Sequence, residues 1–111
     1  MAVGNLQSVH DAPAPLSITT TDDALVVTGE IDAQTAPVLA TALTAEGGRH
    51  ELVLDMAGVE FVDSSGLRVL LESHNERLAD HRRLVLRRPS SVVSRLLEVA
   101  GVSDYLVVDN G

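Results

Sequence analysis

Residues 52–71 read LVLDMAGVEFVDSSGLRVLL and join an apolar strand to an amphipathic helix. The first three residues of this stretch are all apolar, which is typical of a short buried strand, and we expect the strand to run from Leu52 to Met56. The segment after Gly66 predicts a helix, because the side chains of its expected buried face recur at helical spacing: Leu67, Leu70, Leu71, His74 and Leu78. Ser64 lies where the strand gives way to this helix. Its hydroxyl therefore either caps the orphan N–H groups of the first turn or is free for a partner to modify.

The segments before this stretch predict a β-hairpin followed by a helix. Residues 16–20 and 25–27 have strand-like apolar patterns, and Asp22-Asp23 between them predicts a tight turn. Gly29-Glu30-Ile31-Asp32 then leads out of the hairpin, and Thr35 is the expected N-cap of the helix that follows. A strand, a helix and the next strand form a crossover unit, which joins parallel neighbours in a sheet.

The C-terminal part continues the alternation of helices and strands. The helix that begins at Ser64 is expected to end near Ala79, and residues 84–86 predict a fourth strand. A third helix is expected between Ser90 and Gly101, and a last strand over residues 105–108. The order β-β-α-β-α-β-α-β predicts an α/β fold, with a mixed β-sheet, an antiparallel edge hairpin and packed α-helices.

The composition indicates one small domain with an aliphatic core. The 111 residues include one Phe, one Tyr and no Trp, and all eight basic residues are arginines. We expect a loose N-terminal arm over residues 1–15 and a single domain over residues 16–111. The formal net charge of −8 disfavours direct binding to nucleic acid or to an anionic membrane. With no cysteine, no membrane-spanning run and no leader-like N-terminus, the expected location is the cytoplasm.

The sequence does not predict an enzyme. A serine nucleophile needs a nearby base and an oxyanion site, and the DSSG segment lacks the G-x-S-x-G pattern of a nucleophile elbow. None of the four histidines is well placed to act as a base on Ser64: His10, His50, His74 and His81. The sequence contains neither a Walker loop nor a G-x-G-x-x-G segment, and the spacing of its histidines does not suit a metal. We therefore expect no catalysis, no metal and no cofactor.

Two local features are compatible with Ser64 as a modification site. Gly66 is expected to leave the backbone uncrowded, so that a partner approaches closely. The expected buried face of the helix begins only at Leu67, so the residues before it are needed little for core packing. Asp63 is expected to interact favourably with the N-terminus of the helix. A serine before a helix is more often a plain cap, however, and at this level both interpretations stay open.

Three blocks of the sequence resemble the STAS domain of bacterial anti-sigma factor antagonists. The first is GEID at residues 29–32, followed by a helix start at residues 35–37, TAP. The second lies within residues 52–67 and contains LVLD and FVDSSGL. The third is LLEVAGV at residues 96–102. The resemblance covers about residues 16–108, and its most specific part is the DSSG block.

The resemblance implies a partner-switching regulator. In this family the unphosphorylated antagonist binds an anti-sigma factor that is also a serine kinase, and thereby releases a sigma factor. The kinase phosphorylates the first serine of DSSG, which corresponds to Ser64, and a metal-dependent serine phosphatase restores the protein. The aspartate of GEID, here Asp32, lies on the same contact surface in the family. We expect that surface to include five further residues: Asp63, Ser65, Gly66, Leu67 and Arg68.

Two features depart from the family pattern, and two other functions stay open. Family members usually continue into a final helix after the fifth strand, whereas this sequence stops at Gly111, which leaves a homodimer over the uncovered surface as an option. The N-terminal arm is also longer than the domain needs. One alternative function is a STAS module of different use, such as a scaffold or the cytoplasmic part of an anion transporter. The other is a small ligand- or nucleotide-binding domain in which Ser64 and Asp32 contact a phosphate or a sugar.

Overall fold

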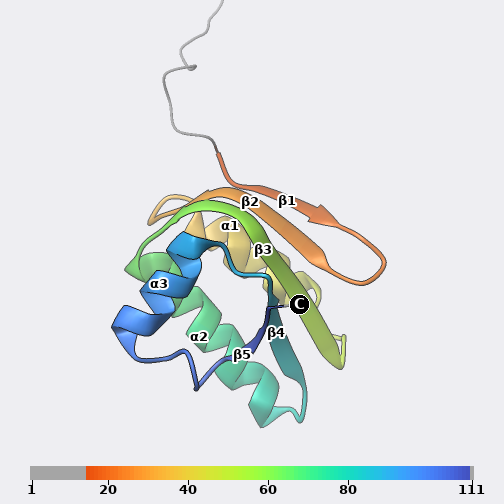
Figure 1. Cartoon of the computed structure of the whole chain (residues 1–111). Helices are drawn as coiled ribbons and strands as arrows, with labels where there is room; N and C mark the ends of the chain where they lie inside the picture. Colours follow the sequence, from red (N-terminus) through yellow and green to blue (C-terminus); the bar gives the residue numbers. More distant parts are fainter. Residues whose placement is uncertain (1–14, 111) are drawn as a thin grey trace, which may run out of the picture.

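A computed structural model describes residues 15–110, and its strands form one five-stranded mixed sheet in the order β1-β2-β3-β4-β5 (Figure 1). The arm expected over residues 1–15, including His10, falls outside the described residues except for Pro15. The order of the elements confirms the predicted α/β fold. In chain order they are β1 (Ser17–Thr20), β2 (Leu25–Ile31), α1 (Ala36–Ala45), β3 (Glu51–Val62), α2 (Ser64–Ala79), β4 (Arg83–Arg87), α3 (Ser91–Ala100) and β5 (Val107–Asp109).

The first two strands form the predicted antiparallel hairpin, and the other neighbours in the sheet are parallel. Ser17 lies opposite Thr28, and Thr20 lies opposite Leu25. The turn is closed by a hydrogen bond from the N–H of Thr21 to the carbonyl of Ala24 (2.8 Å). The pairs β2–β3, β3–β4 and β4–β5 are each joined along the chain by one helix, which is how a chain connects parallel strands.

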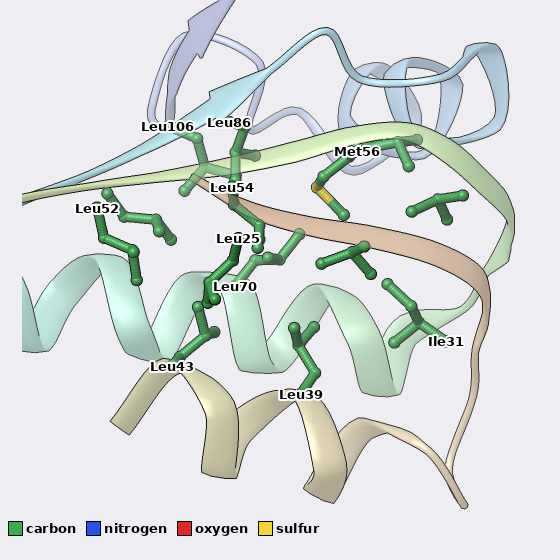
Figure 2. Packing of buried hydrophobic residues seen from close by; sticks show 14 of the residues in the cluster. Leu25, Ile31, Leu39, Leu43, Leu52, Leu54, Met56, Leu70, Leu86 and Leu106 are labelled. Carbon is green, nitrogen blue, oxygen red and sulfur yellow. The ribbon is translucent and has the colours of Figure 1, made fainter. Parts of the chain in front are cut away.

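Much of the hydrophobic core lies between the sheet and helices α1 and α2, which cover the same face of the sheet (Figure 2). Val93 and Leu97 of α3 belong to the same buried cluster. Leu39 and Leu43 of α1 and Leu70 of α2 point toward the strands, where they meet side chains such as Leu25 and Leu54. All of these side chains are buried and aliphatic, as the composition predicts. Because both helices are anchored to one face, their first turns come together at the carboxyl ends of β2 and β3.

Strands β2 and β3 extend further than the sequence pattern predicts. β2 continues through Ile31, so Gly29 and Glu30 belong to the strand and do not lead out of it. β3 continues to Val62, well beyond the end near Met56 that its apolar run suggests. The two strands stay paired to their last residues, with Ile31 opposite Val62. The backbone N–H and C=O groups at these strand ends are satisfied by a strand that is distant in the sequence. The local pattern of apolar residues therefore does not reveal how far each strand extends.

The C-terminal helix has the caps that the sequence predicts, whereas the last strand starts later. The side chain of Ser90 accepts a hydrogen bond from the N–H of Val93 (3.4 Å) at the start of α3. Gly101 ends α3 in the left-handed region, at φ 75°. β5 begins only at Val107, so Tyr105 lies outside the sheet.

Candidate functional site

Ser64 is the first residue of α2, and it is exposed. Within residues 15–110 its hydroxyl has no hydrogen-bond partner. The helix is capped instead by Asp63, whose carboxylate accepts hydrogen bonds from the N–H groups of Ser65 (2.8 Å) and Gly66 (3.4 Å). Asp63 has the extended backbone of an N-cap, at φ −116° and ψ −169°. The capping role therefore belongs to Asp63, and the Ser64 hydroxyl is not needed for it.

A tight loop after β2 holds Asp32 beside the start of α1. One carboxylate oxygen of Asp32 accepts hydrogen bonds from the N–H groups of Thr35 (3.0 Å) and Gln34 (2.9 Å). These bonds, led by the one from Thr35, lower the pKa of Asp32 below its usual value, so the carboxylate is charged at neutral pH. Thr35 occupies the N-cap position of α1, as predicted. Its hydroxyl forms no capping hydrogen bond, however, and donates instead to the carbonyl of Glu30 (2.8 Å).

Asp32 and Asp63 lie side by side at the carboxyl edge of the sheet. The residues before them, Ile31 and Val62, are register partners in the parallel pair β2–β3. The N–H of Asp63 also donates to the carbonyl of Ile31 (3.1 Å). Because neighbouring strands are only about 4.8 Å apart, two carboxylates flank the start of α2. Ser64 therefore stands in a locally negative environment.

A hollow lies between the first turns of α1 and α2, and Ser64 forms part of its wall. The wall on the α1 side consists of small or apolar side chains, and the α2 side adds the polar ones. The lining residues are Ala33, Ala36, Pro37, Ser64, Ser65, Arg68 and Val69. Arg68, which is exposed, is the only charged residue among them. The hollow and its small apolar wall were not foreseen from the sequence, because they depend on how two helices far apart in the chain pack together.

Two of the predicted contact residues face inward. Gly66 is buried, and a Cβ at this position would lie 2.7 Å from the Cγ2 atoms of both Ile31 and Val62. The expectation that Gly66 leaves the backbone uncrowded is therefore wrong: its missing side chain lets α2 pack closely on the ends of β2 and β3. Leu67 is half-buried and packs against the core. The remaining predicted residues keep exposed surface: Asp32, Asp63, Ser64, Ser65 and Arg68.

One exposed aromatic residue lies close to the site in the sequence and was not predicted to be exposed. Phe61 of β3 is 45% exposed, two residues before Asp63. β4 pairs with β3 only as far as Asp55, so no strand covers that side of β3 near Phe61. Its neighbour Val62 packs toward Gly66 of α2, so the Phe61 side chain faces the opposite side of the sheet from the hollow. Its position two residues before DSSG was the available signal.

The described histidines lie away from Ser64. His74 is buried on α2, almost three helical turns after Ser64, and burial lowers its pKa. His50 precedes β3 and His81 precedes β4, so both lie near the amino ends of these strands, whereas Ser64 lies at the carboxyl end of β3. Residues 15–110 contain no group of three or more potential metal ligands. Over the same residues, none of the helices combines the length and the apolar character that crossing a bilayer requires.

Comparisons with known proteins agree on one family. The family model described as "Mlab, STAS domain" matches residues 15–108. An anti-sigma-B factor antagonist from Listeria monocytogenes is 35% identical over 88 residues, which are 78% of this chain and 77% of that protein. The crystal structure of an anti-sigma factor antagonist from Mycobacterium paratuberculosis has a TM-score of 0.71 and 27% identity, and the match covers 94% of this chain and 91% of that one.

A more distant structure has the same fold. The phosphorylated form of the Bacillus cell fate determinant SpoIIAA matches with a TM-score of 0.62 and 19% identity, over 84% of this chain and 89% of that one. The family match spans nearly all of the described residues, from the hairpin to the last strand. The resemblance seen in the GEID and DSSG segments is thus confirmed, and this chain belongs to the STAS domain family.

Proposed function

We propose that this protein is an anti-sigma factor antagonist that is switched off by phosphorylation of Ser64. In its unphosphorylated form it binds an anti-sigma factor that is also a serine kinase, and thereby releases a sigma factor. The observation that carries this proposal is the state of the Ser64 hydroxyl: it is exposed at the start of α2 and has no hydrogen-bond partner within residues 15–110. Because Asp63 caps the helix, Ser64 can be modified without loss of the cap.

The names of the relatives support the regulatory role. The Listeria protein is named an anti-sigma-B factor antagonist, and the Mycobacterium structure is named an anti-sigma factor antagonist. SpoIIAA, which shares the fold, has been solved in a phosphorylated form. A fold of this kind therefore accommodates a phosphate in at least one protein.

Charge explains how one modification would weaken binding. A phosphate adds nearly two negative charges at neutral pH, and here it would stand beside Asp63 and the charged Asp32. A partner surface that fits a small neutral hydroxyl would have to desolvate this group without a matching cation. Leaving a charge unpaired in an interface costs several kcal/mol, and each 1.4 kcal/mol weakens binding about tenfold. The switch therefore needs no large conformational change.

The contact surface would surround the hollow between α1 and α2. Asp32, Ser65 and Arg68 keep exposed surface around Ser64. A metal-dependent serine phosphatase, acting on the same exposed group, would return the protein to its binding form.

Mapping of the phosphorylated residue tests the proposal directly. The chain would be incubated with ATP and candidate anti-sigma kinases from its own organism, and then digested with trypsin. The tryptic peptide over residues 50–68 contains Ser64 and Ser65 but no Thr or Tyr, so a single phosphate on it can be assigned to one of two residues. We expect Ser64→Ala to abolish the label and Ser65→Ala to retain it. Loss of the label only in Ser65→Ala would contradict the assignment.

Binding measurements test the charge mechanism separately. Ser64→Ala should bind the cognate anti-sigma factor as tightly as the parent chain, because it keeps a small neutral group. Chain with phosphoserine at position 64 should bind at least tenfold more weakly. Equal affinity of the phosphorylated and unphosphorylated chains would show that the phosphate does not act by charge in the interface.

The nucleotide-binding alternative predicts a different result without any partner. A nucleotide-binding domain would bind ATP or GTP with micromolar affinity in isothermal titration calorimetry. The hollow beside Ser64 offers one arginine and a small apolar wall, and the loop after β2 contains no glycine-rich phosphate cradle. We therefore expect no such binding, and the antagonist function is the one that the site supports best.

A further inference from the structure

The start of α2 has few backbone donors left for a phosphate on Ser64. The N–H groups of Ser65 and Gly66 donate to the carboxylate of Asp63, and the N–H of Leu67 donates to its carbonyl (3.1 Å). A helix N-terminus usually stabilises an anion through these donors. Here an added phosphate would have to displace Asp63, which is itself negative. The backbone therefore offers the phosphate little stabilisation, and a nearby cation would supply it.

Arg68 is the cation within reach. It follows Ser64 by four residues on α2, so the two Cβ atoms are roughly 5–6 Å apart on one face of the helix. Side chains on a helix lean toward its N-terminus, which directs Arg68 back over the first turn. Both residues line the same hollow, and Arg68 is the only charged residue there.

The guanidinium of Arg68 is also uncommitted, which is uncommon in this chain. Six of the eight arginines have side-chain partners: Arg49 and Arg83 form ion pairs with glutamates, Arg87 and Arg88 pair with Asp55, and Arg77 and Arg82 donate to carbonyls at the end of α1. Only Arg68 and Arg95 have no side-chain hydrogen bond or ion pair within residues 15–110. Glu72, one turn beyond Arg68, forms no ion pair with it.

We infer that Arg68 is a positioning residue for the phosphorylated state: its guanidinium binds the phosphate on Ser64 within the same chain and holds it over the hollow between α1 and α2. This inference rests on the proposed phosphorylation of Ser64. An anionic residue that precedes a cationic one by four positions has the favourable orientation on a helix. Arginine also suits a phosphate because its planar fork donates two parallel hydrogen bonds.

The pair would change what a partner meets at the site. In the unmodified chain the hollow is open, with Ala33, Ala36 and Pro37 on one wall. In the phosphorylated chain the phosphate and the guanidinium would lie over that wall. The modified protein would then cover part of its own contact surface. One guanidinium offsets only about half of the phosphate charge, so a partner would still meet the remaining negative charge beside Asp63 and Asp32.

Titration of the phosphate tests the inference without any kinase. Phosphoserine is installed at position 64 during translation, and its second pKa is measured by 31P NMR at constant ionic strength. An adjacent cation stabilises the dianion and lowers this pKa, whereas Asp63 and Asp32 raise it. We expect Arg68→Gln to raise the phosphate pKa by about half a unit relative to the chain with Arg68. Arg68→Lys should stay close to the parent value, because it keeps a positive charge.

Arg95→Gln is the matched control, because Arg95 is the other uncommitted arginine and lies on α3. It removes the same charge and should leave the phosphate pKa unchanged. An unchanged pKa in Arg68→Gln, or an equal rise in both variants, would overturn the inference. Amide NMR spectra of each variant check that the fold is intact. A second measurement follows the side-chain Nε–H signal of Arg68, which should shift when phosphoserine replaces serine.

The result is separable from the proposed function. Because phosphoserine is incorporated during translation, the titration measures the interaction between the phosphate on Ser64 and Arg68 even if no kinase modifies this chain. Conversely, a kinase that labels Ser64 leaves the pair untested until the titration is done.

Discussion

Gly66→Ala should destabilise the protein, although alanine is the better helix former. Relative to glycine, alanine in a helix is favoured by about 1 kcal/mol. At this position the new Cβ would lie 2.7 Å from Cγ2 of Ile31 and 2.7 Å from Cγ2 of Val62. Both neighbours are β-branched and stiff, and Ile31 is completely buried, so they yield little space. Overpacking of this kind costs about 1–3 kcal/mol, so we expect a net loss of about 1 kcal/mol in the free energy of unfolding.

Urea unfolding followed by circular dichroism measures this loss, with Gly48→Ala as the matched control. A Cβ at Gly48 meets nothing within 4 Å, and the backbone there is open to alanine. The control should be neutral or more stable by up to about 1 kcal/mol, because alanine restricts the unfolded chain. If Gly66→Ala were as stable as Gly48→Ala, the close packing of α2 on β2 and β3 would not be the reason for glycine at position 66.

Three further outcomes can be checked by the same method. Asp63→Ala should lower the free energy of unfolding by about 1 kcal/mol, because Ser65 and Gly66 lose their capping acceptor, and Asp63→Asn should recover most of it. Burial lowers the pKa of His74, so below about pH 6.5 the unfolded chain binds a proton that the folded chain does not. The free energy of unfolding should therefore fall as the pH drops below about 6.5, by at most about 1.4 kcal/mol per pH unit. His74→Phe should remove this pH dependence. Arg77→Met should lower the free energy of unfolding by about 2 kcal/mol, because three carbonyl groups lose a buried donor. Arg68 is exposed, so Arg68→Met should change the free energy of unfolding by less than about 0.5 kcal/mol. A pH dependence unchanged by His74→Phe, or equal effects of the two arginine substitutions, would contradict these expectations.

The order of helices and strands could be predicted from the sequence because it depends on local patterns. Ser90 and Gly101 bound α3 as expected, since caps act within one turn of their own helix. The length of β3 could not be predicted in this way. Its second half contains Gly58 and Glu60, which break the strand-like pattern, and it is held by pairing with β2, more than 25 residues earlier. Pairing over such a distance leaves no periodic signal.

The candidate site was predicted in outline and corrected in its details. The junction at Ser64 follows from a strand pattern meeting a helix pattern, both of which are local. Both Asp and Ser are good N-cap residues. A shift of the helix start by one residue therefore decides whether Asp63 or Ser64 caps α2, and the sequence does not fix the start that closely. The burial of Gly66 depends on Ile31, which belongs to another strand. The lack of a partner for Arg68 depends on where every acidic side chain comes to lie, so only the folded chain reveals it.

The separation of Asp63 and Ser64 explains how the fold could carry a reversible switch at little cost in stability. If Ser64 were the cap, a phosphate on its oxygen would replace a neutral acceptor at the helix start, and the first turn would have to adapt. Because Asp63 holds the Ser65 and Gly66 amides, that turn is already fixed before any modification. Close packing at Gly66 fixes it further, since α2 cannot shift toward Ile31 or Val62. A phosphate on Ser64 would therefore place its charge at the surface, where a partner and Arg68 would respond to it while the core is unchanged.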